Sequence, residues 1–175
     1  SPEPRAVRKQ PTRSTKQSWS KRGEFACSCK NDGAKKCVIG ECGNDVSEME
    51  CNNYICSFGD IDCGNRRYLR HYLTSCVRRN CGQSLEGQSG LFAFEDIPQF
   101  VFIGQYVGEI KSMKDVSGFY CAEGRSGGKS FVVDSQGKGN LTRFINHSCD
   151  PNCLMINRNV MGESQIWIQT LKEIK

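Results

Sequence analysis

Long apolar runs are absent from this chain of 175 residues. No run approaches the roughly 18 apolar residues that a membrane span needs, and no charged-then-apolar leader with a cleavage site is visible, so we expect no membrane association. The sequence also lacks an amphipathic helical pattern of about 15 residues and any internal repeat. Short strands joined by glycine-rich links remain, and the 18 glycines favour a small, mainly β fold.

Acidic residues are nearly missing from the first 23 positions. This stretch carries seven Lys or Arg and only Glu3, whereas the rest of the chain has a net charge of −1. With so few apolar residues it cannot bury enough surface to fold, so residues 1–23 are predicted to form a disordered basic tail. Such a tail is either a solvated linker or a weak contact for nucleic-acid phosphates.

Cysteine is abundant, with 12 residues, and seven of them lie between positions 27 and 63. An odd number of thiols suits disulfide pairing badly, whereas seven thiolates fill the eight ligand positions of two zinc ions if one sulfur bridges both. Few apolar residues lie in this stretch, so metal binding would supply its folding energy, typically ~10–16 kcal/mol per structural zinc. We expect zinc rather than disulfides, and the predicted ligands are Cys27, Cys29, Cys37, Cys42, Cys51, Cys56 and Cys63.

Apolar periodicity and glycine breaks predict four strand regions after the cysteine-rich stretch. They cover residues 90–94, 100–110 (a strand pair or a bent strand), 130–134 and 165–171. In the second region, Phe102, Tyr106 and Ile110 are expected to point inward.

The stretch from Arg143 to Cys153 is the most distinctive of the chain. It reads RFINHSCDPNC and follows the turn-forming residues 137–140. A lone Asn-His pair would indicate a loop with a packed histidine, but the full string resembles the RFxNHSCxPN signature of SET-domain protein lysine methyltransferases. In that family the segment threads beneath another one to form a pseudoknot. The cysteine-rich stretch, which closes with CGNRRY at 63–68, resembles the associated-with-SET (pre-SET) module of the NSD/Ash1-like subfamily of nuclear histone H3 methyltransferases.

The resemblance implies a site for S-adenosylmethionine. The signature residues match the adenosyl end of the family's cofactor site, an aromatic pair matches the residues beside the cofactor, and the turn before Leu91 matches the glycine-rich cofactor turn. The cofactor-binding residues implied in this way are Gly87, Gln88, Ser89, Phe119, Tyr120, Arg143, Asn146 and His147.

The resemblance also implies a catalytic tyrosine. Tyr106 stands in the string YVGE, which matches the YxGE strand whose tyrosine lines the family's lysine channel. Methyl transfer needs a neutral lysine amine, although a free lysine has a pKa of ~10.4, and it needs the two reactants held in line. A narrow aromatic channel that strips water from the amine would meet both needs. Read alone, Tyr106 and Tyr120 would be core tyrosines with satisfied hydroxyl groups.

Two departures from the family pattern affect the predicted site. Gln88 and Ser89 stand where the family's GxGL turn has a glycine and an aromatic residue, and glutamine needs more room than glycine beside a ligand. Only nine residues separate Glu109 from Phe119, where the family inserts a helical segment that forms one wall of the peptide groove.

Two further departures concern the end of the sequence. Residues 167–171 read WIQTL where the family favours Gly and Phe-Ala, and the sequence ends at Lys175, before the strand that carries another tyrosine of the family site. The later cysteines that join Cys149 at the family's third zinc would also follow. Because the sequence begins with Ser rather than Met, we expect a fragment of a longer protein.

These expectations give a domain plan and a function. Residues 1–23 form the basic tail, 24–68 a zinc-binding pre-SET module, and 69–175 a β-rich SET domain that is incomplete at its C-terminal end. The expected function is transfer of methyl from S-adenosylmethionine to a histone lysine, on H3, in the nucleus and on chromosomes. The histone tail or nucleosome is the expected partner, with weak DNA contact through the tail and the arginines of 66–79. The alternative is a catalytically inactive SET-like chromatin-binding module, and by itself the chain is expected to methylate poorly.

Overall fold

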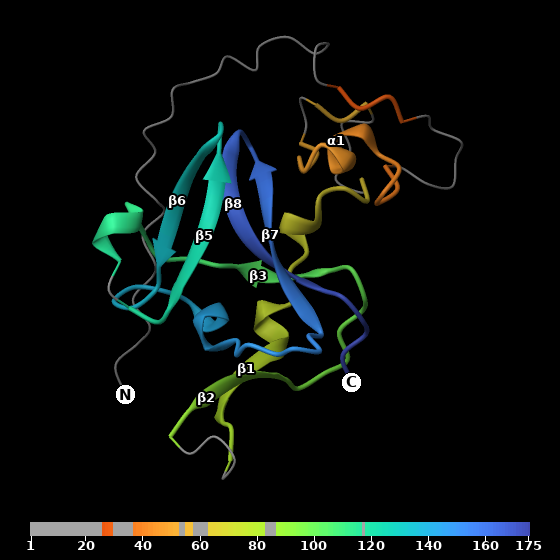
Figure 1. Cartoon of the computed structure of the whole chain (residues 1–175). Coiled ribbons are helices and arrows are strands. Elements are labelled where there is room, and N and C mark those ends of the chain that lie inside the picture. The colour runs from red at the N-terminus through yellow and green to blue at the C-terminus, as the bar shows by residue number, and fades with distance from the viewer. Residues whose placement is uncertain (1–25, 30–36, 53–54, 58–62, 83–86, 117) are drawn as a thin grey trace.

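The computed structural model describes residues 26–29, 37–52, 55–57, 63–82, 87–116 and 118–175 (Figure 1). The predicted basic tail, 1–23, lies outside these residues. In the part that is described, strands dominate and helices are short, which confirms the mainly β prediction. None of the described helices is long and apolar enough to cross a membrane.

Eight strands form three small antiparallel sheets in the described residues. The strands are β1 Cys76–Asn80, β2 Ser89–Ala93, β3 Phe102–Gln105, β4 Glu109–Lys111, β5 Cys121–Ser126, β6 Lys129–Asp134, β7 Cys153–Val160 and β8 Glu163–Thr170. The sheets have the orders β1-β2, β3-β8-β7 and β4-β6-β5. Short helices connect them: α1 Gly43–Val46 and the 3-10 turns η1 Arg67–Leu69, η2 Leu73–Ser75, η4 Met113–Asp115 and η5 Leu141–Phe144.

Two-residue turns close the two longest hairpins. Gly127 and Gly128, with φ of +55° and +76°, join β5 to β6, and Met161 and Gly162, with φ of +55° and +84°, join β7 to β8. Two successive positive φ values give the type I′ turn, whose twist matches that of the flanking strands. The hairpins lie side by side in Figure 1, and the main-chain N–H of Arg125 on β5 donates to Asn157 on β7 at 3.1 Å.

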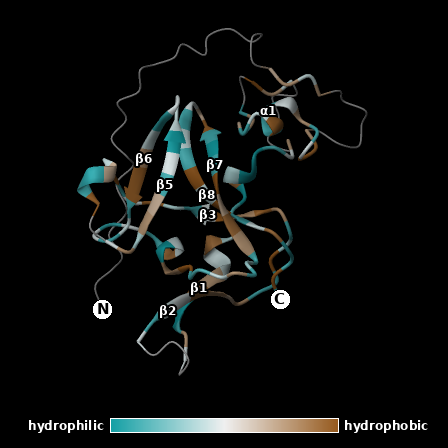
Figure 2. Ribbon diagram, in the orientation of Figure 1, coloured by the Kyte–Doolittle hydropathy of each residue, from teal (hydrophilic) through white to brown (hydrophobic). Residues whose placement is uncertain are grey.

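Strand β8 lies between β3 and β7, and its two faces belong to different apolar clusters. Ile166 and Ile168 pack in the main core, with Ile103 of β3 and the side chain of Tyr106. Trp167 points the other way and stacks on Phe102, with ring centroids 4.9 Å apart. Because successive strand residues face opposite sides, one apolar run on β8 serves two cores. In Figure 2 the hydrophobic colour covers only part of β8, because polar residues flank the apolar ones.

The predicted strand regions match observed strands, with one correction. The range 90–94 overlaps β2, and the range 100–110 overlaps β3 and β4. The range 130–134 overlaps β6, and the range 165–171 overlaps β8. In the second range, Phe102 and Tyr106 are buried as predicted, but Ile110 is 55% exposed. The inward prediction for Ile110 was wrong because the strand does not continue: β3 pairs with β8, whereas β4 pairs with β6 in another sheet. The alternation of inward and outward residues in β3 therefore cannot be continued past residues 106–108 into β4.

The described residues between 26 and 68, here called the cysteine module, lie beside β7 and around α1 (Figure 1). Main-chain contacts join the module to this strand, since Glu50 N–H donates to the carbonyl of Asn159 and Asn159 N–H donates to that of Glu48, both at 2.9 Å. The module thus pairs with the sheet β3-β8-β7 at the edge formed by β7.

Candidate functional site

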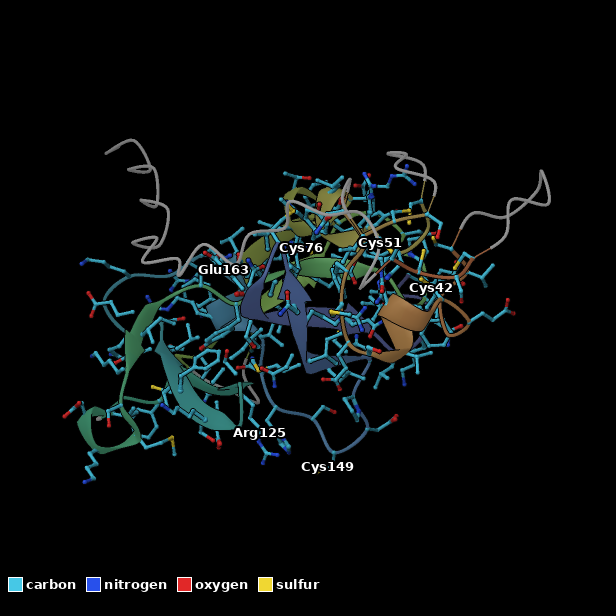
Figure 3. All side chains as sticks on the ribbon, turned by 90° about the horizontal axis from the view of Figure 1, so that it is seen from above. Cys42, Cys51, Cys76, Arg125, Cys149 and Glu163 are labelled. Carbon is cyan, nitrogen blue, oxygen red and sulfur yellow. The ribbon has the colours of Figure 1, made fainter. Side chains whose placement is uncertain are left out.

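The seven clustered cysteines are free thiols that converge in one place. Six are buried and Cys29 is partly buried. The Sγ atoms of Cys27 and Cys37 lie 3.5 Å apart, and those of Cys42 and Cys51 lie 3.9 Å apart, next to α1 (Figure 3). A disulfide would need about 2.05 Å. Two sulfurs on one tetrahedral zinc, each about 2.3 Å from the metal, would be about 3.8 Å apart. The thiols therefore have the spacing of metal ligands.

The sulfurs fall into two overlapping groups of four whose atoms all lie within 4.8 Å of one another. Both groups contain Cys27 and Cys37, while Cys63 belongs to the same buried cluster outside either group. The arrangement fits a metal–thiolate cluster, and sharing of sulfurs between two groups is what seven ligands for two ions would require.

Polar hydrogens point at several of these sulfurs. The amides of Asn44 and Asn65 donate to Cys51 Sγ at 3.3 and 3.4 Å, and the main-chain N–H of Ser57 donates to Cys27 Sγ at 3.4 Å. Burial by itself raises the pKa of the Cys27 thiol, but hydrogen bonds, chiefly with Ser57, outweigh it and lower the pKa to about 6. Such donors stabilise thiolates and orient them, as second-layer contacts do around bound metals.

Four charged side chains dock the cysteine module on the sheet. The Oδ1 atom of Asp45 accepts hydrogen bonds from Arg67 at 2.6 Å and from Arg158 of β7 at 2.7 Å. The Oε1 atom of Glu50 accepts from the same two guanidinium groups, at 3.0 Å from Arg67 and 3.2 Å from Arg158. All four side chains are less than a tenth exposed. We call them the buried quartet, and their charges balance.

The buried quartet corrects one expectation about DNA. Arg67 belongs to it, and Arg66 is only 4% exposed. These two arginines are therefore not available to face phosphates, although their sequence suggested a basic surface.

The signature segment meets the predicted cofactor turn through Asn146. Its Nδ2 atom donates to the carbonyl of Ser89 on β2 and to Cys81 Sγ, both at 3.3 Å. A Cβ atom at Gly90 would lie 2.9 Å from Cys81 Sγ and 3.3 Å from Asn146 Nδ2. Only glycine fits beside these side chains without displacing them, which explains the glycine at 90.

A second part of the predicted site surrounds Phe144 of η5. The guanidinium of Arg143 lies 4.3 Å from the ring centroid of Tyr120, and the Tyr120 and Phe144 rings meet edge to face at 6.3 Å. Asn140 fixes η5, because its Oδ1 accepts from Thr142 N–H at 3.1 Å and its Nδ2 donates to Gln105 of β3 at 2.8 Å. Arg143 Nε is buried and has no hydrogen-bond acceptor among the described residues, so it can still bind a ligand.

Tyr106 lies between β3 and β4 and is 3% exposed. Burial raises its pKa, while a hydrogen bond with Ser135 and the positive charge of Arg143 act against this rise. Just beyond it the main chain passes directly over β6: a Cβ atom at Gly108 would lie 2.3 Å from the carbonyl oxygen of Asp134. The glycine of the YxGE string is thus required by close packing.

The remaining predicted residues lie at the surface. Gly87 and Gln88 are exposed, although the Gln88 carbonyl accepts from Cys81 N–H at 3.0 Å. Phe119 is fully exposed. The structure gives His147 one side-chain contact, at 3.8 Å from its Nε2 to Cys149 Sγ, among the described residues. Cys149 is exposed and stands apart from the cysteine module (Figure 3).

Predicted residues therefore come together in two groups, and other residues connect them. Asn146 meets Ser89, and Arg143 meets Tyr120. Sequence reasoning missed Arg78, Cys81 and Phe144, which contact these groups. Phe144 stands in the signature itself, but nothing in the sequence marks which of the five arginines of 66–79 lies beside it.

The described residues thus form a cluster of free thiols docked on a three-sheet β domain, with a group of polar and aromatic side chains beside the turn at Gly90. The family follows from comparison with known proteins. The SET domain family model matches residues 88–175, half of the chain. The chain therefore belongs to the SET-domain family.

Named relatives agree with this assignment. Histone-lysine N-methyltransferase ASHH2 of Arabidopsis thaliana is 32% identical over 162 residues, which is 86% of this chain and 9% of the relative. The Mus musculus protein named "Histone-lysine N-methyltransferase, H3 lysine-36 specific" is 29% identical over 163 residues, 85% of this chain and 6% of the relative. The chain thus spans less than a tenth of the length of either.

The fold has close counterparts among solved structures. The crystal structure of polycomb repressive complex 2 of Chaetomium thermophilum contains a chain that superposes with a TM-score of 0.71 at 24% identity, over 86% of this chain and 23% of that one. This likeness establishes the SET fold and confirms the predicted fold class.

Proposed function

We propose that this chain is the catalytic domain of a histone-lysine methyltransferase, which transfers methyl from S-adenosylmethionine to a lysine of histone H3. The observation that carries the proposal is the meeting of Asn146 with Ser89 and of Arg143 with Tyr120 in a chain of the SET-domain family, in which Tyr106 is buried. The names of the relatives support a histone substrate on H3, and a chromatin-associated place in the nucleus follows from that substrate.

The residues of the pocket fit the cofactor. Arg143 Nε has no hydrogen-bond acceptor among the described residues, so it offers a donor to the cofactor. Asn146 and His147 would hold the adenosyl end, with Tyr120 packed beside the cofactor. When bound, S-adenosylmethionine supplies an electrophilic methyl group.

The protein's part in the reaction is to position and desolvate the lysine. Tyr106 lies in an apolar environment that raises its own pKa, and the same environment disfavours the charged form of a lysine that enters. Most of the acceleration of methyl transfer can come from holding a neutral amine in line with the methyl group. No acid or base at the reacting carbon is then required.

Two zinc ions in the cysteine module are a second part of the proposal. Its basis is the pair of overlapping four-sulfur groups and the buried, free state of the thiols. Elemental analysis of the purified protein should give close to two zinc per chain. One ion or none, in protein whose thiols are reduced, would contradict the proposed number.

Methyl transfer is tested with labelled S-adenosylmethionine on nucleosomes and on H3 peptides that include lysine-36. Tyr106→Phe should lower turnover by at least about tenfold, because misplacement by ~1 Å can cost on the order of a hundredfold. Tyr68→Phe is the matched control, since Tyr68 lies in the other core and its hydroxyl only approaches Met161 Sδ at 4.0 Å.

The assay also separates the alternative of an inactive chromatin-binding module. The Gln88-Ser89 turn and the short link after Glu109 predict poor activity for this chain. Turnover above background by the purified chain establishes the enzyme. A chain that binds nucleosomes but shows no methyl transfer would instead favour the inactive module.

A further inference from the structure

We propose that Arg78 is a positioning residue of the cofactor site, which acts by tying the cofactor turn to Phe144. The inference rests on the proposed function, because it assumes that this pocket binds S-adenosylmethionine. The family signature and the predicted set of site residues both leave Arg78 out.

Arg78 contacts two separate segments with one planar group. It lies on β1, and its Nε donates to the hydroxyl of Ser89 on β2 at 2.9 Å. Its guanidinium carbon also lies 4.4 Å from the centroid of the Phe144 ring in η5. No carboxylate lies within ion-pair distance of Arg78 in the described part of the chain, so these two contacts are what hold it.

Both contacted residues are parts of the proposed pocket. The carbonyl of Ser89 accepts from Asn146, so Ser89 is held by Arg78 through its side chain and by Asn146 through its main chain. Phe144 packs against the edge of Tyr120, and the Arg143 guanidinium lies 5.5 Å from the Phe144 centroid. Arg78 is therefore the group that joins the Asn146 side of the pocket to the Tyr120 side.

The serine at 89 gains a role from this geometry. It departs from the aromatic residue of the family turn, and its hydroxyl is the acceptor that Arg78 uses. A lysine at 78 would keep the charge, but it has neither the planar face for Phe144 nor the Nε donor direction for Ser89. The contact depends on shape more than on charge.

The test measures cofactor binding by titration calorimetry and steady-state kinetics on an H3 peptide, with the purified protein. Arg78→Met should raise the Kd and the KM for S-adenosylmethionine by about tenfold, since it removes a hydrogen bond from a charged donor and a stacked contact. The KM for the peptide and the kcat at saturating cofactor should stay near those of the wild type. Arg78→Lys should bind as weakly as Arg78→Met.

Two further variants make the result specific. Ser89→Ala removes only the acceptor and should weaken binding by a smaller factor; it should add little to Arg78→Met, because the two changes remove the same interaction. Arg125→Met is the matched control, an exposed strand arginine on β5 whose side chain has no partner among the described residues, and it should leave cofactor binding unchanged.

The outcomes separate this inference from the proposed function. Wild-type protein that binds no S-adenosylmethionine would overturn both. Normal cofactor binding by folded Arg78→Met, or full rescue by Arg78→Lys, would overturn the role of Arg78 and leave the proposed function intact. If Arg78→Met does not fold, Ser89→Ala decides: binding equal to that of the wild type overturns the inference.

Discussion

Glu50→Gln should destabilise the protein strongly, although the substitution barely changes the size of the side chain. Glu50 is 1% exposed, and its carboxylate faces Arg67 and Arg158. Its other oxygen accepts from the main-chain N–H of Arg67 at 2.7 Å. Glutamine keeps one oxygen as an acceptor but removes a charge, which leaves two buried guanidinium groups with only Asp45 to balance them.

Removal of one partner from a buried ion pair costs about 3–5 kcal/mol, because the remaining charge stays desolvated. For a chain of this size that corresponds to a fall in melting temperature of about 6–20 °C. Thermal and urea unfolding at neutral pH measure it, with zinc content checked in each sample because Glu50 precedes a predicted metal ligand, Cys51.

Glu109→Gln is the control for this experiment. Glu109 pairs with Lys138 at 2.8 Å, as close as the pairs of the buried quartet, but the two side chains are 45% and 77% exposed. Exposed ion pairs contribute little, so the control should unfold close to the wild type. If Glu50→Gln retains its zinc and unfolds like Glu109→Gln, the reasoning about the buried quartet is refuted.

Three other predictions follow from packing, turn geometry and metal binding. Gly108→Ala should destabilise by about 1–3 kcal/mol or more, because its Cβ would lie 2.3 Å from the Asp134 carbonyl oxygen, whereas Gly137→Ala has nothing within 4 Å and should be tolerated in the same urea titration. Met161→Asn should stabilise by about 1 kcal/mol, seen as a higher melting temperature, since Met161 has φ of +55° before Gly162 and asparagine suits that turn position; an unchanged or lower value would contradict this. Zinc chelation should unfold the cysteine module, measured by circular dichroism and thiol accessibility, and recovery on adding zinc would separate metal loss from thiol oxidation.

The sequence predicted those parts of the fold that depend on local pattern. Apolar periodicity located four strand regions, and cysteine spacing predicted a thiol cluster that the structure assembles. Strands β1, β5 and β7 were missed because their residues are polar or mixed: β1 reads CVRRN and β5 reads CAEGRS. These strands form because they pair with apolar neighbours, and pairing partners are not visible in one sequence.

The candidate site was predictable only where residue identity carries the information. The resemblance to SET domains assigned site roles to Arg143 and Asn146 through the signature and to Tyr106 through the YxGE string. Arg78 could not be chosen in this way, since its importance comes from the register Arg78↔Leu91 of the β1-β2 pair. That register brings its side chain beside Ser89 and Phe144, which are distant in sequence.

Strand β3 connects the cysteine module to the candidate site. Phe102 faces the cysteine module, where Arg67 of the buried quartet lies 4.8 Å from its ring centroid. The next residue, Ile103, faces the opposite side and packs in the core that contains Tyr106. Tyr106 follows the strand directly, and its main-chain N–H donates to the carbonyl of Ile166 on β8 at 2.8 Å. One face of β3 thus contacts the cysteine module, while the end of the strand positions the candidate catalytic tyrosine. The module supports the site by fixing this sheet and contributes none of the residues proposed to contact the cofactor.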